Sequence, residues 1–405
     1  MRLKNIRNLF LGLAVLAIVA LVSYKIGQGN KIIPLASGQL DLSLMWKVKE
    51  KLSLDYLEKD SLDNQKMKYG AIQGMVAALD DPYTVFLPPQ ENKSANEDLA
   101  GEFGGVGISL GYSKDGVLAV MSPLTGTPAD KAGIKAGDLI LKIVDKNNNV
   151  DQDTNGISLS EAVNLIRGDI GTEVTLTMYR ESNQKRSEVV LKRDNIEVPG
   201  VELEWLEVGS RKIAWVKMSK FSEDLFTKWN EVVSQINNEK KSLGNNYGGI
   251  ILDLRNNPGG YLQASVVVAS DFIKEGVVVK QESTKGITEV YNVERNRGNL
   301  LNDKLVVLVN GGSASASEIL AGALRDYKRA TIVGVKTFGK GTVQQPEDFS
   351  DGSGLHLTIA RWLLPNGANI HKEGILPDIE VKEATDSAEV DLQLEKAKEV
   401  VLENN

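Results

Sequence analysis

Residues 305–345 constrain the fold most strongly, because they combine two short apolar runs with a serine-rich turn and a helical segment. The first run, Leu305 to Val309, is continuous and rich in β-branched residues, as expected for a strand buried on both faces. It ends at Asn310, after which three serines alternate with alanine before helical spacing begins. A serine here lies at a helix N-terminus, where free N–H groups and the helix dipole stabilise negative charge. The segment therefore predicts an oxyanion hole.

Composition excludes several classes of function. The chain has 405 residues, enough for two or three domains, with 42% hydrophobic and 25% charged residues, as in ordinary globular proteins. A net charge of −7 disfavours a nucleic-acid partner. Cysteine is absent, which excludes disulfides and thiolate metal sites and agrees with export. Only His356 and His371 are available for a zinc site or a Ser-His-Asp triad, so we expect no metal or cofactor.

The N-terminal 30 residues predict export. Arg2, Lys4 and Arg7 precede an uncharged run of 16 residues from Leu9 to Tyr24. This run is shorter than the roughly 20 residues of a full membrane span, so a cleaved signal peptide competes with a membrane anchor. Because the run ends in a poor cleavage site, we favour an uncleaved anchor with its N-terminus inside. The expected location is the cell envelope, on the extracytoplasmic side of the cytoplasmic membrane.

Two domains are predicted before the last one. Residues 31–98 carry helical periodicity, whereas residues 99–195 change to short strands with glycine turns. In the second region, Gly105-Val106-Gly107-Ile108 opens a strand, the segment 128–144 gives a short helix and an apolar strand, and Arg167 ends a further helix. This order resembles a PDZ domain, in which such a loop binds a peptide's terminal carboxylate while the peptide adds as an extra strand.

Residues 196–385 alternate strands with helices, which predicts an α/β layered core. A second buried strand, 249–254, runs into the turn RNNPGG, so both glycine-rich turns follow the end of a buried strand, where ligands usually bind. We also expect strands at 355–360 and 369–375, a solvated loop at 238–247, and a closing helix within 386–405. The whole chain is expected to be a multidomain α+β protein.

The two turns together suggest nucleophilic catalysis. A serine hydroxyl attacks a carbonyl only when a base removes its proton and donors stabilise the oxyanion. The candidates for the base are Lys336, Lys340 and the two histidines, and a lysine serves if burial lowers its pKa. Gln344 lies four residues beyond Lys340 and its carboxamide is suited to hold a neutral amine. Each motif also has an ordinary explanation, since serines near helix starts are usually caps and glycine loops are usually turns.

The segments FGGVGISL, ILDLRNNPGG, VLVNGGSASASEILAGAL and VGVKTFGKGTVQ resemble the carboxy-terminal processing (tail-specific) proteases, which are Ser-Lys serine peptidases with a PDZ domain and a crotonase/ClpP-like core. The resemblance covers nearly the whole chain. It implies Ser315 as nucleophile, Lys340 as general base and Gln344 as its partner. It also implies an oxyanion hole from the amide of Ala316 and from Gly259 or Gly260, without deciding between these glycines.

The resemblance further implies protein substrates with apolar C-terminal tails, recognised at residues 105–108. Arg167 is a hypothetical relay from the tail site to the core, although a helix C-terminus often carries such an arginine. A homo-oligomer through the N- and C-terminal helices is also possible. Three alternatives stay open: a catalytically silent PDZ scaffold, a crotonase-like acyl-transfer enzyme, and Ser315 paired with His356 or His371.

Overall fold

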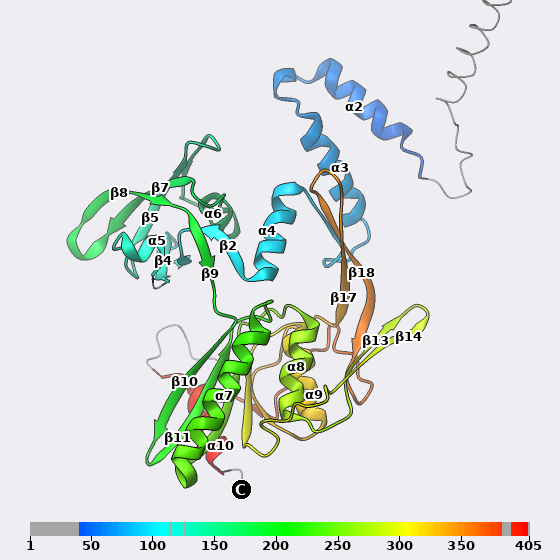
Figure 1. Ribbon diagram of the computed structural model, residues 1–405. Helices are drawn as coiled ribbons and strands as arrows, with labels where there is room; N and C mark the ends of the chain where they lie inside the picture. Colours follow the sequence, from blue (N-terminus) through cyan, green and yellow to red (C-terminus); the bar gives the residue numbers. More distant parts are fainter. Residues whose placement is uncertain (1–39, 114, 125, 383–389, 404–405) are drawn as a thin grey trace, which may run out of the picture. The chain divides into compact units, whose positions relative to one another are not determined.

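The computed structural model describes residues 40–113, 115–124, 126–382 and 390–403 (Figure 1). The chain divides into two compact units, residues 1–70 and 71–405. The expected N-terminal anchor, within residues 1–30, lies outside the described residues. Among the residues that are described, no helix is both long and apolar enough to cross a membrane.

The described part of the first unit, residues 40–70, is helical, as the periodicity within residues 31–98 predicts. It contains α2 (Ser43–Asp55), η1 (Lys59–Ser61) and the start of α3 (Asn64–Ala77). None of the residues of α2 is buried, although the helix carries several large apolar side chains. Leu44 is 70% exposed and Trp46 is 60% exposed. Helix α2 thus presents an apolar surface that none of the described residues of its unit covers.

The core of the second unit is a mixed sheet with the strand order β10-β11-β12-β15-β16-β19. Its strands are β10 (Val201–Val208), β11 (Arg211–Met218), β12 (Tyr247–Asp253), β15 (Leu305–Val309), β16 (Thr331–Gly334) and β19 (Ile379–Glu380). Strands β10 and β11 pair antiparallel, and each later neighbour pairs parallel. All five residues of β15 are buried, as a central strand covered on both faces requires.

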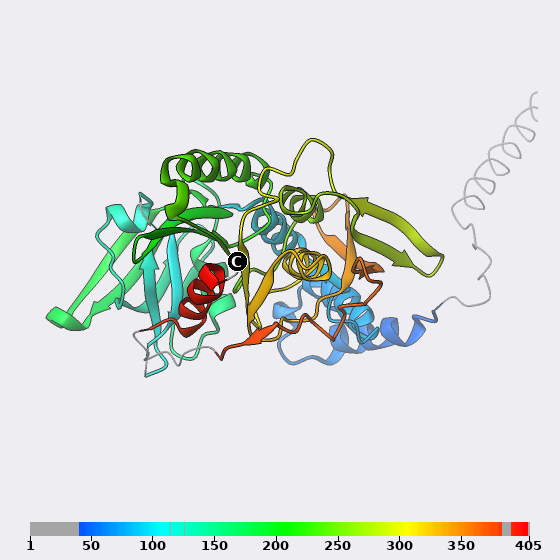
Figure 2. The same ribbon diagram turned by 90° about the horizontal axis from the view of Figure 1, so that it is seen from below.

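Helices cover both faces of this sheet, which confirms the predicted α/β layering. Helices α7 (Leu225–Leu243), α8 (Leu262–Phe272) and α9 (Ala316–Asp326) pack on one face, and α10 (Leu392–Glu403) packs on the other (Figure 2). In β12, Ile250 and Leu252 join the apolar cluster on the α7–α9 side, whereas Ile251 joins the cluster with α10. Successive strand residues point to opposite faces, so one strand serves both layers.

A second, antiparallel sheet lies beside the core in the same unit, and most of it was not predicted. Its strands are β1 (Val85–Leu87), β13 (Val277–Ser283), β14 (Gly286–Asn292), β17 (Thr342–Asp348) and β18 (Gly354–Leu363). Strand β18 pairs with both β1 and β17, and His356 is opposite Val85 in one pairing and Pro346 in the other. These pairings attach a segment from the start of the unit to the region around residue 340.

The strand-rich region between these parts has the element order that the sequence predicts. The sheet runs β3-β4-β5-β7-β8, with β6 paired to β5, so β3 is an edge strand. Its strands are β3 (Ile108–Tyr112), β4 (Leu118–Pro123), β5 (Leu139–Asp145), β6 (Val150–Asp153), β7 (Glu173–Arg180) and β8 (Lys185–Lys192). Its helices are α5 (Pro128–Lys131), α6 (Leu159–Ile166) and the short η2 (Glu181–Asn183).

Short elements connect this region to the rest of the unit. They are α4 (Pro89–Ala100) and the paired strands β2 (Glu102–Gly105) and β9 (Asp194–Glu197). The core also contains the short η3 (Gly244–Asn246), between α7 and β12. At α6, the side chain of Ser158 accepts a hydrogen bond from the amide of Glu161, as the sequence predicts for a helix cap.

Two predictions of local structure are wrong. Residues 369–375 form turns rather than a strand, because Lys372 and Gly374 adopt positive φ angles of 64° and 63°. Residues 238–243 continue helix α7 instead of forming a loop. Their polar character is explained by Lys240, whose ammonium group lies 2.7 Å from the buried carboxylate of Asp303.

Candidate active site

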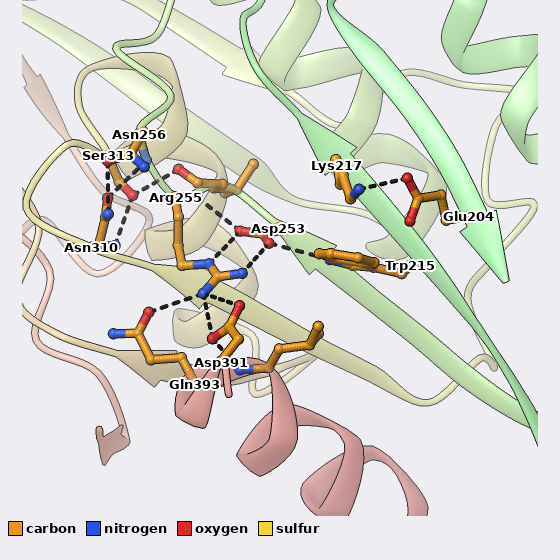
Figure 3. Close-up of polar contacts among 12 residues, drawn as sticks. Glu204, Trp215, Lys217, Asp253, Arg255, Asn256, Asn310, Ser313, Asp391 and Gln393 are labelled. Atoms are coloured by element: carbon orange, nitrogen blue, oxygen red, sulfur yellow. Dashed lines mark hydrogen bonds and ion pairs between the residues drawn. The ribbon is translucent and has the colours of Figure 1, made fainter. Parts of the chain in front are cut away.

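Two glycine-rich turns, residues 254–260 and 310–315, meet at the carboxyl ends of the paired strands β12 and β15. The amide of Asn256 donates to Oδ1 of Asn310 at 2.8 Å, and Nδ2 of Asn310 donates to Oδ1 of Asn256 at 2.8 Å (Figure 3). The amide of Ala314 donates to the carbonyl of Asn257 at 3.0 Å. The first turn therefore fixes the second, as expected for turns at one edge of a sheet.

The three serines of the second turn have different environments. Ser313 is buried and its hydroxyl donates to the carbonyl of Leu254 at 2.8 Å. Ser317 is also buried, and its hydroxyl donates to the carbonyl of Asn257 at 2.9 Å. Both hydroxyls are thus committed to holding the two turns together. Ser315 is only partly buried, and among the described residues its hydroxyl donates to no acceptor.

The backbone of Ser315 is strained. Its φ of 55° and ψ of −115° lie in a region that residues with a side chain rarely adopt. The residue immediately precedes α9, so its side chain stands at the helix N-terminus. A nucleophilic serine on a sharp strand-to-helix turn has the same kind of strained, exposed placement.

The glycines of the first turn approach Ser315 closely. A Cβ atom added to Gly259 would lie 2.8 Å from Cβ of Ser315 and 3.0 Å from the amide nitrogen of Ala316, so a side chain is excluded there. The amide of Gly259 donates to Oδ1 of Asn257 at 2.9 Å. In the described part of the chain, the amides of Gly260 and Ala316 donate to no acceptor. These two N–H groups are not used in holding the two turns together.

Lys340 lies in the loop between β16 and β17 and is half-buried. Burial lowers the pKa of its ammonium group, and no carboxylate offsets this effect. The loop is held in place, because the amide of Lys372 donates to the carbonyl of Gly339 at 2.8 Å and the amide of Phe338 donates to the carbonyl of Ser313 at 3.0 Å. An amine in this setting loses its proton more readily than an exposed lysine.

The buried carboxylate of Glu318, on α9, connects the serine turn to the lysine loop. One of its oxygens, Oε2, accepts from the amide of Ser315 at 2.9 Å and from the amide of Lys340 at 2.9 Å. The other oxygen, Oε1, accepts from the hydroxyl of Thr337 at 2.6 Å and from the amide of Gly339 at 2.7 Å. The backbone nitrogens of Ser315 and Lys340 are therefore no farther apart than twice the length of one hydrogen bond.

Gln344 is the expected partner of Lys340, and His356 is an alternative candidate for the base. Nε2 of Gln344 donates to the hydroxyls of Thr342 and Thr358 at 2.8 and 3.2 Å, so this amide group is anchored to the β17–β18 pair. Burial, followed by the charge of Lys340, lowers the pKa of His356. The partnership of Gln344 with Lys340 stays a prediction.

Arg255 connects the first turn to the C-terminal helix. Its guanidinium donates to both oxygens of Asp253 at 2.9 and 2.7 Å, to Asp391 at 2.9 Å and to Gln393 at 3.3 Å (Figure 3). Asp253 also accepts from the indole of Trp215 at 3.2 Å. The turn that carries Gly259 and Gly260 is therefore anchored both to its own strand and to the start of α10.

The predicted tail-binding loop precedes the free edge of β3. The carbonyls of Val106 and Gly107 accept from the amides of Ala129 and Leu124, both at 2.9 Å, whereas the amides of Val106 and Gly107 donate to no described residue. The following Ile108 is partly buried. Amides that point away from their own sheet at a strand edge are suited to a carboxylate.

Arg167 links this domain to the core in two steps. Its guanidinium lies 3.9 Å from the ring centroid of Phe103 and 2.6 Å from the carboxylate of Asp98, on α4. The carbonyl of Asp98 accepts from the ammonium group of Lys220. The next residue, Phe221, donates its amide to the carbonyl of Gly259 at 2.9 Å. A continuous set of contacts therefore joins α6 to the first glycine-rich turn.

Comparisons with known proteins identify the family. Residues 212–381 match the model of peptidase family S41, residues 120–180 match a PDZ domain, and residues 37–90 match the N-terminal domain of the activating protease CtpB. The chain is 35% identical over 385 residues to the carboxy-terminal processing protease CtpA of Bacillus subtilis (strain 168), covering 94% of this chain and 78% of that protein.

Two further comparisons agree. The "Probable CtpA-like serine protease" of Staphylococcus aureus (strain bovine RF122 / ET3-1) is 38% identical over 373 residues, covering 91% of this chain and 70% of that protein. The solved photosystem II D1 C-terminal processing protease is 31% identical with a TM-score of 0.53, covering 89% of this chain and 91% of that one. The chain belongs to peptidase family S41 and is a carboxy-terminal processing serine peptidase with a PDZ domain.

Sequence analysis did not assign a role to several residues that build this site. Glu318 lies three residues after Ser315, a position that is typical of a capping box and by itself indicates no role in joining two loops. Asn257 and Asn310 were treated as turn residues. Their contacts depend on which turns meet in the fold.

Proposed function

We propose that the protein hydrolyses peptide bonds through an acyl-Ser315 intermediate, with Lys340 as the general base. The neutral amine of Lys340 takes the proton of Ser315 as its Oγ bonds to the scissile carbonyl carbon. When the carbon–nitrogen bond breaks, the ammonium group of Lys340 returns the proton to the leaving amine. A water molecule then attacks the ester carbon and gives a proton to Lys340; the bond between this carbon and Oγ breaks, the new C-terminal carboxyl group leaves, and the ammonium group of Lys340 returns the proton to Oγ of Ser315.

The observation that carries this proposal is the shared carboxylate of Glu318, which binds the backbones of both Ser315 and Lys340 through one oxygen. Two other observations support it. Ser315 is the serine of its turn whose hydroxyl is not committed to a backbone carbonyl, and burial lowers the pKa of Lys340. A lysine that has no partnering carboxylate among the described residues keeps this lowered pKa, as a general base requires.

For the oxyanion hole, we propose the amides of Ala316 and Gly260. The amide of Gly259 is occupied by Asn257, which favours Gly260 as the second donor. Gly259 instead supplies the space beside Ser315 that a side chain would fill. Two preorganised N–H donors at a developing oxyanion are the usual source of transition-state stabilisation in acyl transfer.

We also propose that the PDZ domain selects substrates by their C-terminal tails. The terminal carboxylate binds the amides of Val106 and Gly107, and the tail adds antiparallel to the edge strand β3. The adjoining apolar side chains are partly buried, which favours apolar residues in the tail. They are Ile108, Leu110, Leu159 and Leu165.

In this proposal, Arg167 communicates tail binding to the core through Asp98, Lys220 and Phe221. The contacts of these residues reach the glycine turn of the oxyanion hole. Replacement of Arg167 by alanine should therefore reduce the preference for tailed over tailless substrates. A preference for tailed substrates that is unchanged from that of the wild type would contradict the relay.

We propose further that the N-terminal segment anchors the protein at the extracytoplasmic side of the cytoplasmic membrane, and that two copies associate through α2. The basic residues before an apolar run support the anchor. The exposed apolar side chains of α2 support association with a second copy. Sedimentation of the full chain, compared with a Leu44→Glu/Val48→Glu variant, tests the oligomer, and an unchanged mass would contradict it.

The catalytic proposal is tested with the purified full chain and an unfolded protein that ends in an apolar tail. We expect cleavage by the wild type and none by Ser315→Ala or Lys340→Ala. The double variant His356→Gln/His371→Gln should retain cleavage, which separates the lysine from the histidines as base. Cleavage that survives both alanine substitutions would contradict the dyad, and an inactive wild type would favour a binding scaffold.

A further inference from the structure

A turn from the beginning of the second unit, residues 81–84, is held rigidly beside the lysine loop. Oδ1 of Asp81 accepts from the amide of Tyr83 at 3.0 Å, and Oδ2 accepts from the hydroxyl of Thr84 at 2.7 Å. The hydroxyl of Thr84 in turn accepts from the amide of Thr358, on β18, at 3.1 Å. The turn leads directly into β1, which pairs with β18. The position of Tyr83 is thus fixed by contacts on both sides of it.

The side chain of Tyr83 lies against Lys340. The amine nitrogen of Lys340 is over the phenol ring, 5.3 Å from its centroid. The same ring makes an edge contact with the imidazole of His371, with a centroid distance of 6.1 Å. Both side chains of this pair are half-buried. Tyr83 therefore forms one wall of the space around the amine.

The nearby carboxylate of Asp81 is occupied by two hydrogen-bond donors, the amide of Tyr83 and the hydroxyl of Thr84. Burial, followed by the charges of Glu318 and Asp81, raises the pKa of Tyr83, so its phenol stays neutral. The low pKa of His356 keeps its imidazole neutral above mildly acidic pH. The carboxylate of Glu318 is occupied by its four hydrogen-bond donors. The titratable groups around Lys340 and Tyr83 thus come from the turn (Asp81), from α9 (Glu318), from β18 (His356) and from the loop after β18 (His371).

We propose that Tyr83 is a positioning residue of the active site, whose ring covers the amine of Lys340 and keeps water away from it. The proposal rests on the proposed role of Lys340 as general base and adds a residue to it. Tyr83 does not take part in proton transfer. It acts through Lys340, by maintaining the dry surroundings in which the neutral amine is favoured.

Two opposing effects of the ring can be separated. The face of an aromatic ring attracts an ammonium group, which favours the charged lysine. Removal of water disfavours the charged lysine, and for a buried ammonium group this effect is the stronger of the two. Burial lowers the pKa of Lys340, which is the direction expected when the removal of water outweighs the attraction of the ring. The net effect of Tyr83 should therefore be to favour the neutral amine.

The test compares Tyr83→Phe, Tyr83→Leu and Tyr83→Ala in the full chain, by measuring kcat and KM against pH on the tailed substrate. The wild-type rate should rise with pH through the pKa of Lys340. Phenylalanine and leucine keep the cover, so their midpoints should not rise. Alanine admits water, so its midpoint should move to higher pH, with about a tenfold loss of kcat at neutral pH for each pH unit of movement and recovery at alkaline pH.

A second measurement does not depend on activity. In the inactive Ser315→Ala background, the rate of acylation of Lys340 by acetic anhydride, followed by mass spectrometry across pH, reports its protonation directly. Adding Tyr83→Ala should move this titration upward. An unchanged titration, a loss of activity by the same factor at every pH, or identical behaviour of Tyr83→Phe and Tyr83→Ala would overturn the proposal.

These outcomes are distinct from a failure of the dyad. If Lys340→Ala remains active with its pH dependence intact, the base is another residue and the proposed function fails. If Lys340→Ala is inactive but Tyr83→Ala does not change the titration of Lys340, the dyad stands and only the proposed role of Tyr83 is wrong.

Discussion

The PDZ domain and the protease core each contain a cationic side chain that is shielded from solvent. The cation of the PDZ domain is paired with a carboxylate, and that of the core is not. In the PDZ domain, the guanidinium of Arg193 is fully buried and lies 2.7 Å from the carboxylate of Asp145, with further bonds to the carbonyls of Ile166 and Leu165. In the core, the half-buried Lys340 forms no ion pair with a described residue. A paired cation contributes structure, whereas an unpaired one keeps a shifted pKa that chemistry can use.

The largest effect is expected when Lys340 is replaced by a side chain that cannot lose its proton. Lys340→Arg keeps a charge and length similar to lysine, but arginine stays protonated at all accessible pH values. We expect kcat to fall by about 10³-fold or more, with no recovery at high pH. The matched variant Arg193→Lys in the PDZ domain should leave kcat on a tailless peptide near the wild-type value. Retained activity in Lys340→Arg would break the comparison.

The second prediction concerns the carboxylate that holds the two loops together. Glu318→Gln replaces one acceptor oxygen with an NH₂ group that faces backbone N–H donors. Misplacement of the serine relative to the lysine should lower kcat by about 10²-fold while KM changes little. Thr337→Val removes only one of the donors to this carboxylate and should have a smaller effect. Steady-state kinetics separate these outcomes, and a change confined to KM would argue against positioning.

The third prediction concerns the paired cation. Asp145→Ala leaves Arg193 buried without its carboxylate, which should destabilise the PDZ domain by about 3–5 kcal/mol. Hydrogen exchange in β5 and β7 should accelerate, while kcat on a tailless peptide is retained. If exchange in these strands stays slow, the pair contributes less to stability than its burial indicates.

The smallest effect is on the stability of the core. Burial lowers the pKa of folded Lys340 below its ordinary value of 10.5. Between the lowered pKa and 10.5 the unfolded chain binds more protons, so stability increases with pH in this window and is reduced at neutral pH. Lys340→Met should therefore raise Tm at pH 7 by about 2 °C or more. The gain should vanish as pH approaches 10.5, and a gain independent of pH would point to packing instead.

The sequence predicted those parts of the site that are local in the chain. Apolar runs followed by glycine-rich turns indicated β12 and β15, and the turns after them were correctly expected to lie at one sheet edge. The family resemblance, rather than the spacing, selected Ser315 from three serines. In the structure, Ser313 and Ser317 are distinguished from it by hydrogen bonds to carbonyls about 60 residues away in the chain.

The remaining parts depend on contacts between distant segments, which a single sequence does not reveal. Tyr83 reaches Lys340 because β1 pairs with β18, and the short polar alternation of these strands gave only a weak signal. Glu318 carries the signature of a helix cap, but its second set of donors comes from a loop after β16. Residues 369–375 contain two isoleucines among polar residues, and the positive φ angles of Lys372 and Gly374 exclude a strand there.

The hydrogen bonds of Arg255 to Asp391 and Gln393 also have a consequence for the order in which the site is completed during synthesis. Its partners Asp391 and Gln393 follow Ser315 and Lys340 in the chain, so a nascent chain can contain both residues before the turn of residues 254–260 has its anchor at α10. A protease whose last structural support is translated after its catalytic residues is expected to gain activity late, which limits damage to the cell that makes it. Stalled chains that end before or after residue 393, each followed by a linker long enough to clear the ribosomal exit tunnel, should differ in cleavage, and equal activity would show that the contacts of Arg255 with Asp391 and Gln393 are dispensable.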